Sequence, residues 1–532
     1  MSRGTDTKPD RQAGTDAATP VRSKFATSTP RRDVPFGKLS PTTWFNTPSA
    51  IKWPVVALFS LLMLVSLASS VFAKQNLPGL GEPADASLSP AAELKLGKRF
   101  MRQIRAQVPL IEDIQVVEYI EALGSRLAVN IDNPENHDFT FFVVNSASIN
   151  AFAIPGGFIG FNSGLIDAMN NEDQLAAVVG HEIAHITQRH HARSISSGTR
   201  SRLTTAFAVL AAVLIGQSNP QAGQAALAAG IAASQQSLIN FTRANEYEAD
   251  RVGIEILAAA SYNPAAMAEA FEILKRKNSL NVGSFQLEYL RTHPLDNTRI
   301  AEAKNRATAL QGKELINTSL DFAIFQARTR VLTSRDLNHL GREYLAKVDS
   351  KRATERAAAN YALAMILTER RLFAEAIEQL DPLLENYPDN INIQLLAART
   401  WFESGDTERG IERLQLLSSI FPDNYSVTNM LVGQFIDSNR LNEAQSLLKR
   451  YLKSSQRTNN FAWRDLANVE ENLGDSSASH EALARYFAGL NELSRARQQL
   501  TLALSAVNRG SVDELRINAR IRELDTRLER EK

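Results

Sequence analysis

The stretch "GHEIAHITQRHHA", residues 180–192, contains four of the eight histidines of the chain. Within it, His181, Glu182 and His185 satisfy the pattern H-E-x-x-H. A helix has about 3.6 residues per turn, so the two histidines project from one face and can ligate one Zn²⁺, while Glu182 lies beside them and can take a proton from water. Five-residue matches also arise by chance, and paired histidines occur as plain surface or core residues. The stretch therefore predicts a metal-binding helix that needs support from elsewhere in the chain.

A catalytic zinc site needs a third protein ligand and leaves the fourth position to water. His191 has the spacing of the third histidine in the metzincin pattern, but Gln188, a good helix former, stands where that pattern has a helix-breaking glycine. In a helix that continues over residues 172–193, His191 lies about 15 Å along the axis from His181. We therefore expect His190 and His191 to be solvated residues at the helix end, where the helix dipole favours them.

The composition restricts the other ligands. The chain has no cysteine, which excludes disulfides, thiolate metal sites and cysteine nucleophiles. Any metal must therefore be held by histidine and carboxylate. The formal net charge of +1 provides no global basic surface, and no nucleic-acid-binding motif is present, so we expect no nucleic acid among the partners.

A second acidic motif lies in "NFTRANEYEADRVGIEIL", residues 240–257. H-E-x-x-H followed by E-x-E-A-D-R resembles the gluzincin metallopeptidases related to the CAAX prenyl endopeptidase and the heat-shock membrane protease HtpX. The resemblance implies that Glu246 is the third ligand of one zinc ion per chain and that Asp250 supports the site. Residues four apart share a helix face, so Asp250 can orient a ligating histidine through its free ring nitrogen. We expect Glu248 to point elsewhere.

The segment "YLRTHPLDNTRI", residues 289–300, contains the H-P motif of the same family at His293. We expect this segment near the metal. His293 is a candidate donor to the oxyanion of the reaction intermediate, or a latch that occupies the open metal position, and a helix-capping or turn role is the alternative. Arg299 is a candidate contact to substrate or to a carboxylate.

Residues 138–166 are rich in aromatic and β-branched side chains around Pro155-Gly156-Gly157, which predicts a small meander of strands. We expect the strand in "NAFAIPGGFIGF", residues 150–161, to be an edge to which an extended substrate adds as a further strand. The substrate-binding candidates are Ala151, Phe152 and Ala153, and a purely structural strand is the alternative.

The N-terminal part of the chain predicts export. Residues 1–52 are rich in Ser, Thr and Pro and are expected to be a disordered basic leader. Residues 53–73 have no charged side chain and read either as a signal peptide cleaved after Ala73 or as a retained membrane anchor. A buried core helix is the third reading. Two alanine-rich segments, residues 203–216 and 222–239, predict a helical hairpin over the protein or the lipid surface.

The C-terminal part repeats. Pro388 and Pro422 are 34 residues apart, and Ala376, Gly410, Ala444 and Ala478 follow the same 34-residue step. A small residue and a closing proline at this spacing resemble the tetratricopeptide repeat, with a generic helical array as the alternative. We therefore expect a mainly α protein. An α+β metallopeptidase domain with a small sheet, residues 85–330, is followed by an α-solenoid of tetratricopeptide-like repeats, residues 336–530, whose curved surface binds protein segments.

The combined pattern is similar to exported bacterial members of the family. The resemblance implies a periplasmic zinc endopeptidase with chaperone activity in the assembly and quality control of outer-membrane β-barrel proteins. Its implied partners are unfolded or stalled outer-membrane proteins and, through the repeats, the β-barrel assembly machinery, with peripheral or anchored membrane association. A repeat-based chaperone or assembly adaptor is the alternative. A membrane-embedded prenyl-type protease is disfavoured, since no run after Ala73 reaches about 18 apolar residues.

Overall fold

The computed structural model describes residues 88–131, 134, 137–196, 235–280, 287–310, 319–454 and 459–531. The expected leader and the apolar segment at 53–73 lie outside these residues, as do the alanine-rich segments apart from residues 235–239. Over the part of the chain that is described, no helix is both long enough and apolar enough to cross a membrane.

A three-stranded sheet forms where the aromatic and β-branched segment predicts it. The strands are β1 (Thr140–Val144), β2 (Ala151–Ile154) and β3 (Phe158–Asn162). Their order is β1-β3-β2, with β1 parallel and β2 antiparallel to β3. The expected meander is therefore wrong in its connectivity, because a meander would place β2 in the middle.

The tight turn between β2 and β3 depends on two glycines. Gly156 and Gly157 have φ angles of +84° and +91°, a region that side chains disfavour. A Cβ atom at Gly157 would also lie 1.9 Å from the carbonyl oxygen of Asp138. The turn pairs β2 with β3 directly, so that β1 takes the other side of β3 and β2 becomes an edge strand.

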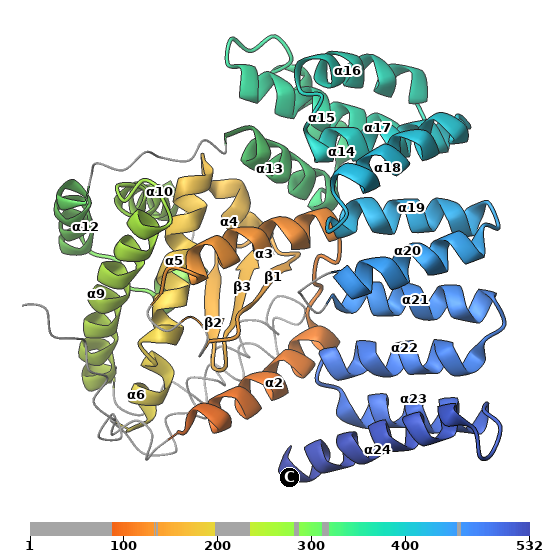
Figure 1. The fold of residues 1–532 in the computed structure, drawn as a ribbon. Coiled ribbons are helices and arrows are strands. Elements are labelled where there is room, and N and C mark those ends of the chain that lie inside the picture. The colour runs from red at the N-terminus through yellow and green to blue at the C-terminus, as the bar shows by residue number, and fades with distance from the viewer. Residues whose placement is uncertain are drawn as a thin grey trace, which may run out of the picture. The chain divides into compact units, whose positions relative to one another are not determined.

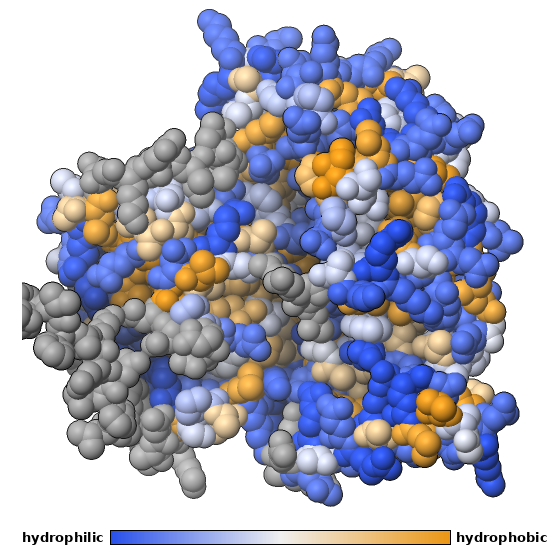
Figure 2. Space-filling view, in the orientation of Figure 1, coloured by the Kyte–Doolittle hydropathy of each residue, from blue (hydrophilic) through white to orange (hydrophobic). Residues whose placement is uncertain are grey.

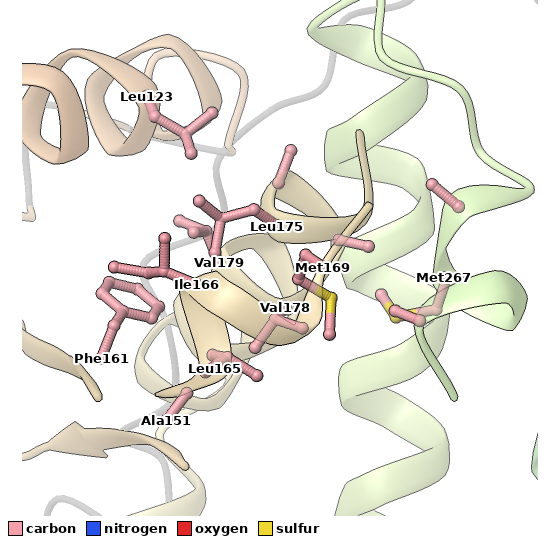
Figure 3. Close-up of a cluster of buried hydrophobic side chains, with 14 of the residues drawn as sticks. Leu123, Ala151, Phe161, Leu165, Ile166, Met169, Leu175, Val178, Val179 and Met267 are labelled. Atoms are coloured by element: carbon pink, nitrogen blue, oxygen red, sulfur yellow. The ribbon is translucent and has the colours of Figure 1, made fainter. Parts of the chain in front are cut away.

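The helix α5 (Glu172–Thr187) passes through the centre of the core that contains the sheet and packs against β2 and α9 (Figure 1). Asn171 caps its first turn by accepting a hydrogen bond from the backbone N–H of Gln174. Figure 3 shows Val178 and Val179 of this helix among apolar side chains of β3 and α4. A helix buried on nearly all sides holds the side chains of the H-E-x-x-H motif in a rigid frame.

Further helices complete this core and continue toward the repeats. They are α2 (Pro90–Gln107), α3 (Ile114–Ala128), α4 (Ser163–Ala168), α6 (His190–Ser196), α9 (Gln235–Ala259), α10 (Ala266–Leu280), α11 (Glu288–Thr292), α12 (Asn297–Ala309) and α13 (Ser319–Thr333). The helix α13 contributes to two cores. Phe325 packs in the core that contains α5 and the sheet, and Ile324 packs in the core of the helices that follow α13.

The C-terminal part is a series of helices joined by short turns. They are α14 (Leu337–Leu345), α15 (Ala353–Glu369), α16 (Phe373–Asn386), α17 (Ile391–Ser404), α18 (Thr407–Ile420), α19 (Tyr425–Asp437), α20 (Leu441–Ser454), α21 (Asn460–Asn472), α22 (Ser476–Gly489), α23 (Leu493–Ser505) and α24 (Val512–Glu531). The chain is mainly α with one small sheet among its described residues, which confirms the expected fold class.

The helices α16, α18 and α20 begin 34 residues apart, in step with the small residues of the sequence pattern. Ala376, Gly410 and Ala444 are buried, and a Cβ atom at Gly410 would lie 2.4 Å from the ring of Phe402. Small side chains at these positions therefore permit close helix packing. Figure 2 shows mostly hydrophilic side chains on this face of the repeat helices, with apolar side chains in separate small patches.

Partly buried and buried polar contacts join the N-terminal helices to the C-terminal helices. Arg328 of α13 donates to both carboxylate oxygens of Asp113, at 2.7 and 2.6 Å, and to the hydroxyl of Tyr361 on α15. Glu118 of α3 accepts hydrogen bonds from the backbone N–H groups of Tyr425 and Ser426, at 2.8 and 3.1 Å. The two parts are thus connected by directional contacts as well as by apolar packing.

Candidate metal centre

Two glycines allow α5 and α9 to approach closely beside the H-E-x-x-H motif. A Cβ atom at Gly180 would lie 3.3 Å from the backbone oxygen of Gly253, and one at Gly253 would lie 3.1 Å from the backbone nitrogen of His181. The close approach places the preceding turns of α9 against His181. The two sequence motifs therefore converge because their helices cross where neither has a side chain.

Four buried side chains meet at this crossing, namely His181, His185, Glu246 and His293. The Nε2 atoms of His181 and His185 are 3.1 Å apart, and Nε2 of His181 is 3.3 Å from Nδ1 of His293. The carboxylate of Glu246 lies 3.4 Å from His181, 3.5 Å from His185 and 3.2 Å from His293. One possible ligand atom from each of the four residues lies within 4.8 Å of those of the other three.

These separations fit a tetrahedral divalent ion. Donor atoms about 2.0–2.1 Å from such an ion lie about 3.3 Å from one another. The distances between ring nitrogens, and from the rings to one or the other carboxylate oxygen of Glu246, range from 3.1 to 3.5 Å. Three imidazoles and one carboxylate are also donors that zinc commonly takes. The residues therefore fit a metal ion in both spacing and chemistry.

The predicted supporting carboxylate lies behind His181. Oδ1 of Asp250 is 3.0 Å from Nδ1 of His181, the ring nitrogen that faces away from the cluster. Arg299 of α12 donates to both oxygens of Asp250, each at 2.7 Å. Its Nη1 lies 2.9 Å from Oε2 of Glu246. Arg299 is 1% exposed. The sequence predicts a contact of Arg299 with either substrate or a carboxylate. In the structure it contacts two carboxylates and is buried.

The electrostatics of the cluster favour a positive charge at its centre. Burial lowers the pKa of His181, but hydrogen bonds with Asp250 and Glu246 outweigh burial and raise it to about 9. Burial raises the pKa of Glu246, but His293 and Arg299 outweigh burial and hold it well below its ordinary value. For His185, burial dominates and lowers the pKa well below its ordinary value. A divalent cation would supply the charge that these carboxylates stabilise.

Glu182 lies beside the cluster with both carboxylate oxygens buried and close to the backbone of Ala153. Burial raises its pKa, with His293 and His181 acting in the opposite direction. Nε2 of His293 is 3.6 Å from Oε1 of Glu182. A buried carboxylate with a raised pKa beside the donor cluster has the properties of a general base.

His293 ends the short helix α11 and is held there by two contacts with Tyr289. Its backbone N–H donates to the carbonyl of Tyr289 at 2.8 Å, and the two rings stack with centroids 4.6 Å apart. The ring reaches both the donor cluster, through Nδ1, and Glu182, through Nε2. The structure therefore places His293 at the donor cluster, a position that fits either of the two proposed roles.

The substrate-strand candidates Ala151, Phe152 and Ala153 form β2, which is an edge strand in the sheet order. All three residues are buried. The backbone of Ala153 is among the groups that lower the pKa of Glu182, so the edge runs beside this carboxylate. The strand is therefore positioned next to the cluster, although its side chains are covered.

The region after the motif differs from the sequence expectation. The helix α5 ends at Thr187, and Arg189 has a φ angle of +51° before α6 begins at His190. The expected continuous helix over residues 172–193 is therefore wrong. A non-glycine residue in this region of φ is uncommon, and nothing in the sequence signalled it. Arg189 is held there by Glu93 and by the carbonyl of Leu88.

The turn buries His190 instead of leaving it solvated. His190 is 3% exposed, and its Nδ1 lies 2.9 Å from Nδ1 of His185. Its Nε2 is 3.2 Å from Glu248, which was expected to point elsewhere. Burial lowers the pKa of His190 to about 4, so the ring is neutral near pH 7. His191 is half-buried and is not one of the four residues of the cluster.

Comparison with known proteins identifies the family of the region that contains this cluster. A model of peptidase family M48 matches residues 115–307. The chain is 33% identical over 476 residues to the beta-barrel assembly-enhancing protease of Escherichia coli (strain K12), covering 89% of this chain and 96% of the relative. The Yersinia pestis protein of that name is 34% identical, covering 85% of this chain and 92% of the relative. The mitochondrial metalloendopeptidase OMA1 of Arabidopsis thaliana is 30% identical over 34% of each chain.

Proposed function

The chain belongs to peptidase family M48 and is a metalloendopeptidase, and we propose that its metal is a single zinc ion held by His181, His185 and Glu246. The observation that carries this proposal is the set of donor atoms spaced 3.1–3.5 Å apart. The zinc ion, when bound, lowers the pKa of a water molecule and polarises the scissile carbonyl group. Asp250 orients His181 through its second ring nitrogen.

Glu182 is the proposed catalytic base. Its carboxylate takes a proton from the attacking water and returns it to the amine nitrogen of the leaving peptide. The peptide bond is then hydrolysed through a tetrahedral intermediate, without a covalent acyl-enzyme. Burial raises the pKa of Glu182, which makes it both a competent acceptor and a competent donor in this exchange.

His293 has two alternative proposed roles, latch or oxyanion donor. When its Nδ1 occupies the fourth corner of the donor set, it excludes water and holds the enzyme latent. In the alternative role, the ring donates to the oxyanion of the tetrahedral intermediate and does not hold the enzyme latent. Latency suits a protease that must not cleave folded proteins.

The substrate is proposed to enter as an extended segment that adds to the edge of β2 at Ala151, Phe152 and Ala153. Support comes from the sheet order and from the approach of Ala153 to Glu182. Because these three residues are buried, the edge of β2 must become exposed before a peptide can pair with it.

The names of the most similar relatives suggest the setting. We propose that the chain acts on unfolded or stalled outer-membrane β-barrel proteins in the periplasm, after export directed by residues 53–73. The peptidase domain is assigned to residues 85–330 and a tetratricopeptide-like domain to 336–530, which would contact the β-barrel assembly machinery. A chaperone or adaptor role for the repeats is the second candidate, favoured by the regular 34-residue helix spacing.

The replacement Glu182→Gln tests the proposed chemistry. The expected result is a loss of cleavage of an unfolded outer-membrane porin by about 10²–10⁴-fold, with zinc content unchanged. The matched control is Glu255→Gln on α9, an exposed carboxylate paired with Arg251, which should cleave at the parent rate. Retained cleavage in Glu182→Gln would contradict the assignment of the base. Binding of the porin by this variant would show whether a chaperone role persists without proteolysis.

A further inference from the structure

His190 lies directly behind one of the proposed metal ligands. The Nδ1 atoms of His190 and His185 are 2.9 Å apart, whereas Nε2 of His185 faces the donor cluster. On its other side, Nε2 of His190 is 3.2 Å from Oε2 of Glu248, and Arg193 contacts the same oxygen at 2.7 Å. His185, His190 and Glu248 thus form a chain that leads away from the metal position.

The hydrogen positions in this chain follow from metal binding. A ligand that binds through Nε2 as a neutral imidazole carries its proton on Nδ1. Nδ1 of His185 must then donate to Nδ1 of His190, which leaves the His190 proton on Nε2, where it is donated to Glu248. Each ring nitrogen of His185 and His190 then has one role in this series of contacts, and only one tautomer of each ring satisfies all of them.

The arrangement parallels the support of the other histidine ligand. Asp250 lies 3.0 Å from Nδ1 of His181 and contacts it directly. The carboxylate of Glu248 supports His185 indirectly, because it contacts His190 and His190 contacts His185. Both carboxylates lie on α9, two residues apart, so one helix supports both histidines that α5 presents.

A local distortion delivers His190 to this position. A continuing α5 would carry His190 along the helix axis and away from His185, because five residues advance about 7.5 Å. Arg189, with its positive φ angle, instead lies between the end of α5 and the start of α6 at His190. Arg189 is fixed by a side-chain contact with Glu93 at 3.1 Å and by the Leu88 carbonyl at 2.7 Å. A strained turn held by such contacts indicates that the placement of His190 is specified by the fold.

We propose that His190, supported by Glu248, is a positioning residue that fixes the tautomer and ring orientation of His185 for metal binding. The inference rests on the proposed function, since it requires that His185 binds the ion. The zinc affinity of the chain should therefore depend on His190, although His190 is not one of the metal ligands. Loss of such supporting partners typically weakens metal affinity about 10- to 100-fold.

Zinc affinity of the full chain tests the proposal, measured by competition with a chromogenic chelator in the Glu182→Gln background, which removes self-cleavage. We expect His190→Leu to lower the affinity about 10- to 100-fold. His190→Asn keeps a polar atom near the Nδ1 position and should recover most of the affinity. Glu248→Gln should show a smaller loss than His190→Leu, because its amide can still accept from Nε2.

Two control variants separate positioning from general effects. Glu255→Gln changes an exposed carboxylate on the same helix as Glu248, and His339→Leu removes an exposed histidine on α14. Both should bind zinc as the parent does. Circular dichroism of the metal-free variants should match the parent, since a positioning role leaves the metal-free fold intact.

The outcomes distinguish the inference from the proposed function. If the Glu182→Gln parent binds no zinc, the proposed function fails. If the parent binds one zinc per chain and His190→Leu binds it within about twofold of the parent, the positioning role alone is overturned. If His190→Leu fails to fold, Glu248→Ala decides, because unchanged zinc affinity in His190→Asn and Glu248→Gln would also be expected if His190 had no role. Parental zinc affinity in Glu248→Ala then overturns the positioning role. A loss of affinity of about tenfold supports it.

Discussion

Arg299 donates to both carboxylate oxygens of Asp250, each at 2.7 Å, in a pair that is almost completely buried. Asp250 in turn contacts Nδ1 of the proposed ligand His181. The arginine also lies 2.9 Å from Glu246, so a single cation compensates two carboxylates that meet beside the metal position. Its removal would leave both charges without this partner in a region from which water is excluded.

The replacement Arg299→Leu is therefore expected to destabilise the metal-free peptidase domain by about 3–5 kcal/mol, the usual cost of breaking a buried ion pair. A chain of this size need not unfold in one step, so the measurement is native-state hydrogen exchange of the α9 amides. The control is Arg306→Leu on the same helix, which breaks an exposed pair with Glu302 and should cost less than about 0.5 kcal/mol. Equal exchange in the two variants would contradict the structural role of Arg299.

The replacement His293→Ala tests the latch. If His293 holds the fourth corner in about nine of ten molecules, its removal should raise cleavage of an unfolded porin about tenfold, because every molecule then has an open site. The exposed His339→Ala is the control and should cleave at the parent rate. Loss of activity in His293→Ala would mean that the latch is wrong and that the ring is needed in the reaction.

The contact between α3 and α19 supports a further prediction. Glu118 accepts from the first two backbone N–H groups of α19, while Asn424 accepts from that of Val427. Glu118→Ala leaves two N–H groups at the helix start without this acceptor and should cost about 1–3 kcal/mol. The measurement is faster hydrogen exchange in the first turn of α19, with the exposed Glu112→Ala as the control. Unchanged exchange in Glu118→Ala would refute the contact.

Much of the candidate site follows from helix geometry. The four-residue spacings of His181 and His185, and of Glu246 and Asp250, place each pair on one helix face, and the structure brings the two faces together. The three strands occur in the segment whose side chains predict them. These features depend on local periodicity, which a single sequence contains.

Other features depend on contacts between distant segments. The β1-β3-β2 order depends on which edge of the β2–β3 hairpin β1 pairs with, and the residue pattern is compatible with other orders. The end of α5 at Thr187 depends on a positive φ angle at Arg189, which Glu93 of a distant helix supports. The burial of His190 follows from that turn. A propensity argument based on Gln188 could not predict it.

The central claim is that side chains from two crossing helices hold one zinc ion, and anomalous X-ray scattering tests it most directly. A crystal of the Glu182→Gln chain grown with zinc should give one anomalous peak per chain at the zinc edge. The account predicts this peak about 2.0–2.2 Å from Nε2 of His181, Nε2 of His185 and a carboxylate oxygen of Glu246. A peak that does not contact Glu246, or no peak at this crossing, would contradict the account.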